Sequence, residues 1–362
     1  MVFVRTTPPR PVDVSAVFSE LASLARPAIR LHPRPGSPSV RESSVGGPLL
    51  WPAEEPWPHC ESSHLHRDSG FRRSPAIVRL ERRMQARWRP DSGDFELTPE
   101  EEALKERSAA RLAERLDASP PWPADCPVPM LPVAQLYLRD IPLLRPPGQA
   151  DLLQILWCPY DHEPDYKPST ALFWRSAAAV VDILATPPEP YEANYPGYVP
   201  EPCVLAPEAI TEYPDSLDLS PEMRLMVEDR SRWQAAGVGV DSAYVDSTYG
   251  DYPRDFYDCE LADAPGWKVG GWPPWGRTDP YRRYCTVCDV QMVPLLTIAS
   301  FEWDGGEGRS WAPSEDQAAA YAAHYAGQDP SQPTAVEVGS TDNMQLYVCP
   351  TSPEHPHTDL IQ

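Results

Sequence analysis

Three blocks of the sequence recur in the same order in the two halves of the chain. The matches fall mainly on Gly, Trp, Cys and Pro positions, a pattern that composition does not explain. They pair residues 45–56 with 269–280, residues 126–132 with 288–294 and residues 151–159 with 342–350. Because the blocks keep their order, the sequence predicts an internal duplication. The requirement for two similar structural units is therefore the strongest constraint that the sequence places on the fold.

Each repeat has the pattern of a small β unit. The glycine pairs, Gly46-Gly47 and Gly270-Gly271, permit a turn with positive φ and a close backbone approach. Apolar, partly β-branched runs follow in each repeat, and the later run ends in a cysteine. The strands are expected at 130–138 and 152–158 in the first repeat and at 292–303 and 344–349 in the second. Pairing of the two strands would bring the early and late cysteines of each repeat together.

Proline is the most over-represented residue type. The 362 residues include 47 prolines, more than twice the usual share of roughly 5%. Proline fixes φ and cannot donate a hydrogen bond to a sheet, so it favours short strands, turns and extended connections over long helices. The composition predicts an all-β or α+β fold with much irregular structure.

The two halves are expected at 1–186 and 187–362, with the connection at the start of the second half. A helical insertion at about 61–121 distinguishes the first. Within it Thr98 is the expected N-cap of a helix of four or five turns, because Pro99 and three glutamates follow in the first turn.

Two further helices are expected outside this insertion. A helix at 14–25 precedes the first repeat. In the second repeat Ser314 and Gln317 form a capping box for a shorter helix that Gly327 ends. These helices are expected to cover the sheet and to have a packing role.

The charge and the cysteines set limits on partners and compartment. A formal net charge of −22 argues against nucleic acid, whose phosphates reward Lys and Arg, and would steer a basic protein client towards the chain. The start has no apolar signal segment, and no run of 18 apolar residues predicts a membrane span. We expect a cytoplasmic protein, whose eight cysteines indicate metal binding or buried thiols before disulfides. The oligomeric state is left open.

The second repeat contains the strongest candidate metal site. Zinc takes four ligands in a tetrahedron, and a Cys-x-x-Cys turn can supply two of them. Cys285 and Cys288 form such a turn, Cys349 is the natural third ligand, and either His355 or His357 is the fourth. A redox Cys-x-x-Cys is an alternative, although no βαβ thioredoxin pattern surrounds it.

The first repeat offers an equivalent set. Its members are Cys60, Cys126, Cys158 and His162, with His64 as a substitute. In both repeats the alternative is that the cysteines are reduced, buried and act as small hydrophobic residues. Four filled positions would make the metal structural, since a hydrolytic zinc needs an open position.

Motifs for catalysis are weak. The sequence has no G-x-S-x-G, P-loop, G-x-G-x-x-G or HExxH motif, so an enzyme is the less favoured reading. Three tryptophans could line a groove for an extended peptide, although Trp-Pro clusters also serve packing. These are Trp51, Trp272 and Trp275.

The order of motifs carries a family resemblance. A Gly-Gly-x-Pro-x-Trp segment is followed by Cys-x-x-Cys, an apolar strand and a late cysteine, in "WKVGGWPPW", "CTVC", "MVPLLTIASFEW" and "MQLYVCP". With "SSVGGPLLWP" in the first repeat, this order resembles the bacterial YwqG-like family, an uncharacterised family, in its proline-rich actinomycete form. The resemblance spans nearly the whole chain. Residues 269–350 more distantly resemble the eukaryotic programmed cell death protein 2 relatives.

This resemblance implies an α+β fold of two similar β-rich halves with a twisted, largely antiparallel sheet and peripheral helices. The eukaryotic relatives chaperone a basic ribosomal protein, and some YwqG-like genes lie near toxin systems. We therefore expect a protein-binding or chaperone-like module with structural zinc. An immunity protein of a toxin system and a metal-dependent enzyme are the alternatives. Neither resemblance implies a catalytic residue.

Overall fold

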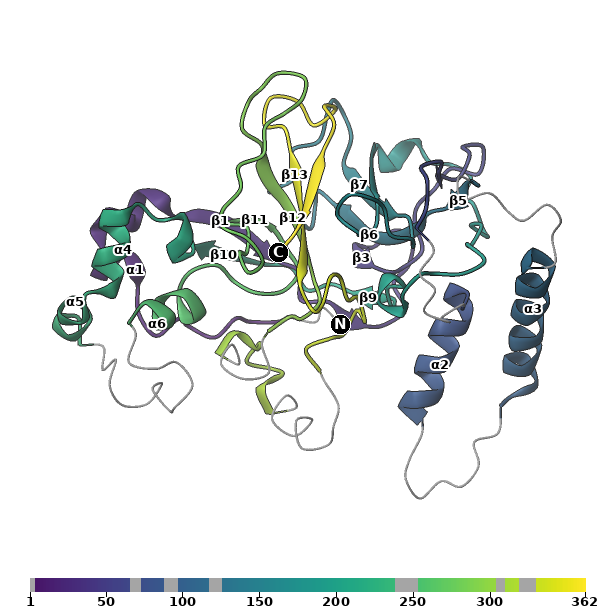
Figure 1. The fold of residues 1–362 in the computed structure, drawn as a ribbon, viewed down its shortest axis with the longest axis horizontal. Helices are drawn as coiled ribbons and strands as arrows, with labels where there is room; N and C mark the ends of the chain where they lie inside the picture. Colours follow the sequence, from purple (N-terminus) through teal and green to yellow (C-terminus); the bar gives the residue numbers. More distant parts are fainter. Residues whose placement is uncertain are drawn as a thin grey trace.

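The computed structural model describes residues 4–65, 73–87, 97–116, 126–237, 253–303, 310–318 and 330–362. Within these ranges the chain has an α+β fold, as the sequence predicts, with two six-stranded antiparallel sheets and helices at the periphery (Figure 1). Among the helices described, none combines the length and apolar character that a membrane span requires.

One sheet contains the strands of the second repeat. Its order is β10-β1-β11-β12-β13-β14. The bounds are Glu208–Glu212 for β10, Arg26–Arg30 for β1, Lys268–Gly270 for β11, Val293–Ala299 for β12, Asn343–Val348 for β13 and Thr358–Ile361 for β14. The expected strands at 292–303 and 344–349 are thus confirmed as β12 and β13.

The other sheet contains the strands of the first repeat. Its order is β2-β9-β3-β6-β7-β8, and a separate pair, β4-β5, lies beside it. The bounds are Arg34–Pro35 for β2, Cys203–Val204 for β9, Ser44–Val45 for β3, Leu131–Tyr137 for β6, Leu152–Trp157 for β7, Thr170–Arg175 for β8, His59–Cys60 for β4 and Val128–Pro129 for β5.

The helices gather at the two ends of the molecule (Figure 1). The α-helices are α1 Val14–Val17, α2 Pro75–Arg87, α3 Pro99–Leu116, α4 Pro221–Glu228, α5 Arg230–Ala235 and α6 Pro253–Glu260. The 3-10 helices are η1 Ser19–Leu24, η2 Ala177–Ala179, η3 Pro196–Tyr198 and η4 Ser216–Asp218. Helices α2 and α3 belong to the insertion in the first repeat. Helices α1, α4, α5 and α6 lie at the opposite end (Figure 1).

Two of the three helices predicted from the sequence lie within the described residues. Thr98 caps α3, because its hydroxyl accepts from the Glu101 N–H while the Glu101 carboxylate accepts from the Thr98 N–H. The expected N-terminal helix is present as α1 followed by η1. The helix expected after Ser314 extends through 319–329, which lies outside the described residues.

Four strands of each sheet correspond in order and register. The series β3-β6-β7-β8 matches β11-β12-β13-β14. In both, the register shifts directly after a proline, at Pro132 and at Pro294. Gly46 and Gly270, at the ends of β3 and β11, both have the expected positive φ, 61° and 75°. A duplication would produce these shared features. The duplication itself remains a prediction from the sequence.

The two sheets do not divide at residue 186. Strand β1 comes from the first half but lies between β10 and β11, whereas β9 comes from the second half and lies between β2 and β3. The chain crosses from one sheet to the other between β1 and β2 and crosses back between β9 and β10. The predicted halves therefore share strands.

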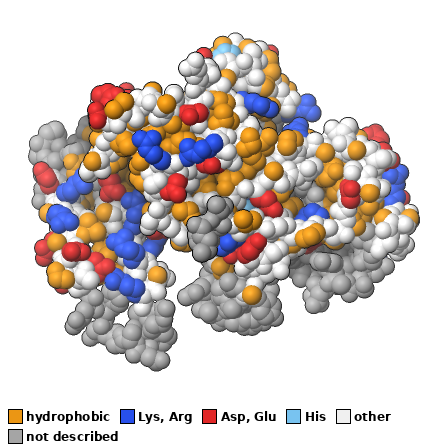
Figure 2. All heavy atoms as spheres, turned by 180° about the vertical axis from the view of Figure 1, so that it is seen from behind, with side chains coloured by type: hydrophobic (Ala, Val, Ile, Leu, Met, Phe, Trp, Pro, Cys, Tyr) orange, Lys and Arg blue, Asp and Glu red, His pale blue; other side chains and the backbone are white. Residues whose placement is uncertain are grey.

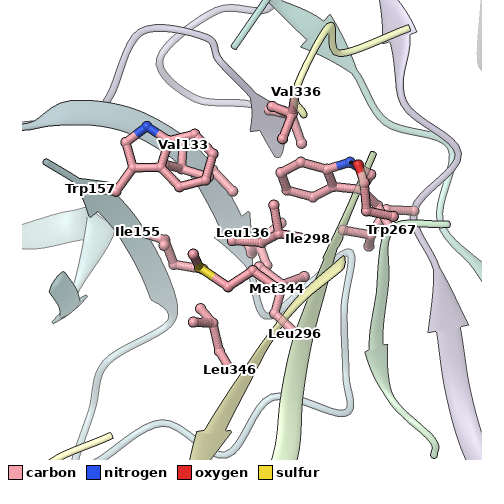
Figure 3. Packing of buried hydrophobic residues seen from close by; sticks show 14 of the residues in the cluster. Val133, Leu136, Ile155, Trp157, Trp267, Leu296, Ile298, Val336, Met344 and Leu346 are labelled. Atoms are coloured by element: carbon pink, nitrogen blue, oxygen red, sulfur yellow. Dashed lines mark hydrogen bonds between the residues drawn. The ribbon is translucent and has the colours of Figure 1, made fainter. Parts of the chain in front are cut away.

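One hydrophobic core joins the sheets. It contains Ile155 and Trp157 of β7 together with Leu296 and Ile298 of β12. Figure 3 shows these side chains facing one another across the interior, with Met344 of β13 between them. Burial of apolar surface of this kind is the main favourable term in folding. Strands β7 and β13, which Cys158 and Cys349 directly follow, both contribute to this core.

Candidate metal centres

The second repeat brings four candidate ligands together. The ligand atoms of Cys285, Cys288, Cys349 and His355 all lie within 4.8 Å of one another, and we call this group the second centre. It contains the predicted three cysteines. Of the two histidines left open by the sequence, His355 is in the group. His357 instead faces Thr170 of β8, with its Nε2 2.9 Å from the hydroxyl.

A tight turn and a strand pair position these ligands. The Cys285 N–H donates to the carbonyl of Val290, and the Asp289 N–H donates to the carbonyl of Cys285. This closes the Cys-x-x-Cys segment into a hairpin that leads into β12. Because β12 pairs with β13, Cys349 at the end of β13 lies beside the hairpin. The predicted approach of early and late cysteines therefore results from antiparallel pairing.

The distances fit one tetrahedral zinc ion. Bond lengths of about 2.3 Å to sulfur and 2.0–2.1 Å to nitrogen imply separations of about 3.8 Å between two sulfur ligands and about 3.6 Å between sulfur and nitrogen. The Sγ atoms of Cys288 and Cys349 are 3.5 Å apart. The Sγ atom of Cys285 is 3.4 Å from Nδ1 of His355. No large side-chain movement is needed to place a metal among them.

Backbone N–H groups point at the sulfur atoms of the second centre. The N–H of Val287 donates to Sγ of Cys285 at 3.4 Å. The N–H groups of Thr351 and Ser352 stabilise the thiolate of Cys349 and lower its pKa to about 6, although burial opposes them. A metal binds the thiolate and not the thiol. This backbone arrangement therefore prepares the sulfur atoms for a cation.

The first repeat forms an equivalent group. It consists of Cys60, His64, Cys158 and His162, whose ligand atoms also lie within 4.8 Å of one another, and we call it the first centre. The prediction that Cys126 is a ligand is wrong, and its predicted substitute His64 takes the fourth position.

The helical insertion explains this exchange. Cys60 ends β4 and Cys126 precedes β5, so they lie on either side of the insertion, as Cys285 and Cys288 lie on either side of the two-residue turn in the second repeat. Here the insertion replaces the two-residue turn, so Cys126 is no longer held beside Cys60. His64 follows Cys60 by four residues, as His162 follows Cys158. This repeated Cys-x-x-x-His spacing was the sequence signal that could have identified His64.

Hydrogen bonds orient His162, one of the two histidines of the first centre. Nδ1 of His162 lies 3.1 Å from the carbonyl of Ser63, and Nε2 lies 3.8 Å from Sγ of Cys60. A proton on Nδ1, donated to that carbonyl, leaves the Nε2 lone pair facing the centre. Metal-binding histidines are commonly oriented in this way.

The two sulfur atoms of the first centre are coupled. A hydrogen bond from the Cys158 thiol lowers the pKa of Cys60 to about 2, assisted by His162 and His64 and opposed by burial. Burial, followed by the charge of its neighbour, raises the pKa of Cys158. Backbone N–H groups of Ser62 and Tyr160 favour the charged forms of Cys60 and Cys158 respectively. Two neighbouring cysteines of this kind carry one proton between them. A divalent cation could replace that proton and bind both sulfur atoms as thiolates.

Two cysteines outside the centres behave differently. The Cys203 thiol donates to the carbonyl of Pro333 at 3.2 Å, and burial raises its pKa. Burial also raises the pKa of Cys259 to about 12. Cys203 is thus a reduced, buried thiol of the alternative interpretation, and Cys259 is a reduced, partly buried one. The contrast separates them from the cysteines of the two centres, each of which receives a backbone hydrogen bond.

The donor sets fit zinc with a structural role. Two thiolates with two imidazoles, and three thiolates with one imidazole, are common structural zinc sets. Each centre supplies four protein ligands, so neither keeps a position for a substrate or water. A cavity of about 530 Å³ borders Arg5, Asp140 and Glu208, and none of the eight ligands lines it.

The predicted tryptophan groove is not formed. Trp51 is 1% exposed and packs against Trp57 and Phe173, so the prediction that it lines a groove is wrong. Trp272 is also buried and lies beneath the guanidinium of Arg26. Trp275 is partly buried and donates to Asp218. The three tryptophan rings have a packing role. Their proline neighbours in the sequence are compatible with both packing and a groove, so the sequence did not distinguish the two.

No protein-family model matches the chain, and no curated protein matches its sequence.

Proposed function

We propose that the chain is a non-catalytic protein-binding module in which each centre holds one structural zinc ion. The observation that carries this proposal is the association of the second centre with exposed apolar side chains. The YwqG-like relationship and the duplication belong to the same proposal, since each repeat contributes one centre at the corresponding sheet end.

A zinc ion would stabilise a part of the chain that has little hydrophobic core of its own. The segment between β11 and β12 runs for 22 residues, 271–292, with no strand or helix of its own. Its later part, which contains Cys285 and Cys288, packs in a small cluster in which Met292, Tyr347 and Leu360 surround the second centre. A metal that joins this segment to the end of β13 contributes its binding free energy to folding.

Exposed apolar side chains concentrate on the same segment. Of the ten large hydrophobic residues exposed in the described chain, five lie between positions 281 and 293. They are Tyr281, Tyr284, Val287, Val290 and Val293, and we call them the hairpin patch. Single exposed apolar residues are ordinary, whereas a group of them marks an interaction site.

The patch lies on a projecting part of the molecule. The loop between β11 and β12 extends beyond the sheet at the top of Figure 1. Figure 2, seen from behind, shows hydrophobic side chains on this projecting end. A loop held rigid by a metal loses little conformational entropy when it binds, which favours affinity.

The charge of the chain supports a basic protein as the partner. A net charge of −22 accelerates the approach of a basic protein at low ionic strength. Of the three arginines on the loop, Arg277 pairs with Asp342 and Arg283 donates to the carbonyl of Asp359. We propose a basic protein client that places an apolar segment on the hairpin patch.

A comparison of matched surface variants tests this proposal. The double variant Val287→Ser/Val290→Ser removes apolar surface from the patch and leaves the zinc ligands intact. The control Val181→Ser/Leu225→Ser removes exposed apolar surface elsewhere. Affinity capture from the native cytosol should enrich one basic protein with the wild type and the control but not with the patch variant. Equal capture by all three would reject the patch, and no capture at low salt would reject the client.

A further inference from the structure

The two centres differ in the access that they give to their sulfur atoms. Cys60 and Cys158 of the first centre are buried, with 6% and 0% exposure, in a cluster that includes Leu49 and Trp57. In the second centre Cys285 and Cys349 are buried, but Cys288 is partly exposed. The side chain of Val287 beside it is 61% exposed.

The partly exposed cysteine of the second centre also lies close to a second sulfur atom. Sγ of Cys288 lies 3.5 Å from Sγ of Cys349, so a movement of about 1.5 Å reaches the disulfide bond length of about 2.05 Å. Cys349 is fixed by the end of β13, whereas Cys288 lies on the exposed turn. The turn can make this movement without disturbing the sheet.

We propose that the second centre is an oxidation site at which a hydroperoxide joins Cys288 to Cys349 and releases the metal, while the first centre retains its metal. This inference rests on the proposed zinc binding. It assigns different chemistry to two centres that the repeats make similar, and it follows from the partial exposure of Cys288.

The reaction balances with the peroxide as the oxidant. The Cys288 thiolate attacks one peroxide oxygen, the O–O bond breaks, and the products are a sulfenic acid and, after proton uptake, an alcohol or water. The Cys349 thiolate then attacks the Cys288 sulfur, and hydroxide leaves as the S–S bond forms. Two thiolates are oxidised by two electrons, and one peroxide is reduced.

Loss of two thiolates leaves too few ligands to hold zinc. Only Cys285 and His355 remain of the second centre, and a structural zinc needs four ligands. In the first centre the same reaction would require peroxide to reach Cys60 or Cys158 through packed side chains. The burial of these sulfur atoms therefore protects the first centre.

Zinc release from the whole chain tests the inference. Protein loaded with two zinc ions is treated with hydrogen peroxide while a chromogenic chelator reports the released metal. We expect one equivalent of zinc to leave at least about tenfold faster than the other, since thiolate exposure controls oxidation. Peptide mapping should then find a Cys288–Cys349 disulfide and reduced Cys60 and Cys158.

Variants that retain one centre assign the two phases. His64→Ala should retain only the fast phase, and Cys349→Ser only the slow phase. A wild-type chain that binds fewer than two zinc ions before peroxide is added overturns the zinc proposal and this inference together. Two bound zinc ions that leave at equal rates, or a Cys60–Cys158 disulfide, overturn the oxidation site alone. The wild-type measurements suffice if a variant does not fold.

Discussion

The Sγ atoms of Cys288 and Cys349 lie 3.5 Å apart although 61 positions separate the two residues. The β12-β13 pair brings them together, because one cysteine precedes β12 and the other follows β13. Their proximity therefore depends on sheet register and not on a local motif. The second centre can form only when this half of the fold is complete.

Substitution of Cys349 should remove one zinc ion and no more. Cys349→Ser deletes a ligand of the second centre and leaves the first centre untouched, so we expect the zinc content to fall from two equivalents to one. Cys203→Ser is the matched control, since Cys203 is a buried cysteine that donates to a backbone carbonyl. Elemental analysis of the purified proteins measures the change. Unchanged zinc in Cys349→Ser would exclude the second centre.

Two variants of the first repeat distinguish the observed centre from the predicted one. His64→Ala removes a member of the first centre, whereas Cys126→Ser removes a cysteine outside it. We expect His64→Ala to bind one zinc ion and Cys126→Ser to bind two. The reverse result would restore the ligand set predicted from the repeat.

Much of the second centre could be predicted from the sequence because two of its four ligands are close together in the chain. A Cys-x-x-Cys turn can supply two zinc ligands, and the apolar runs at 292–303 and 344–349 indicate the strands that bring in Cys349. The fourth ligand was left open because His355 and His357 follow Cys349 at similar spacing. Only the fold shows that His357 turns towards β8.

The first centre was less predictable because alignment of the repeats gave the wrong ligand. Pairing Cys126 with Cys288 is correct for the strands, since both precede equivalent methionines. It fails for the metal, because 65 residues separate Cys60 from Cys126 where only two separate Cys285 from Cys288. Strand exchange was likewise not visible, since β1 and β9 are short and pair with distant partners.

Arg82 should stabilise the fold through hydrogen bonds that join helix α2 of the insertion to residues 196–201 and 335. From α2 it donates to the carbonyls of Val199, Pro196 and Ala335 and pairs with Glu201. Arg82→Ala leaves these acceptors without their donor, so we expect a loss of about 1–3 kcal/mol in the free energy of unfolding.

The matched control for Arg82 is Arg83→Ala, an exposed arginine on the same helix. It should change the free energy of unfolding by less than about 0.5 kcal/mol. Urea denaturation of both variants with zinc present makes the comparison. Equal effects of the two substitutions would show that the contacts of Arg82 contribute no stability.

Glu302 should make stability depend on pH. Burial raises its pKa to about 7, against the attraction of Arg30. A carboxyl with a raised folded pKa contributes stability that is complete below about pH 4.5 and is lost as pH rises through about 7. Glu302→Gln stays neutral, so we expect it to gain about 3 kcal/mol relative to the wild type between pH 5 and pH 8.

The difference between wild type and Glu302→Gln isolates this residue, because zinc binding changes with pH equally in both. Glu54→Gln, an exposed control, should show no such trend. Chemical denaturation at pH 5, 6.5 and 8 measures the difference. A constant difference across this range would mean that Glu302 is already ionised at pH 5.

The mass of the folded chain under native conditions tests the central claim most directly. Intact protein purified without added chelator should have the mass of the polypeptide plus two zinc ions, and denaturation should release both. A native mass equal to that of the bare polypeptide, in protein that is folded and previously supplied with zinc, would contradict the two metal centres.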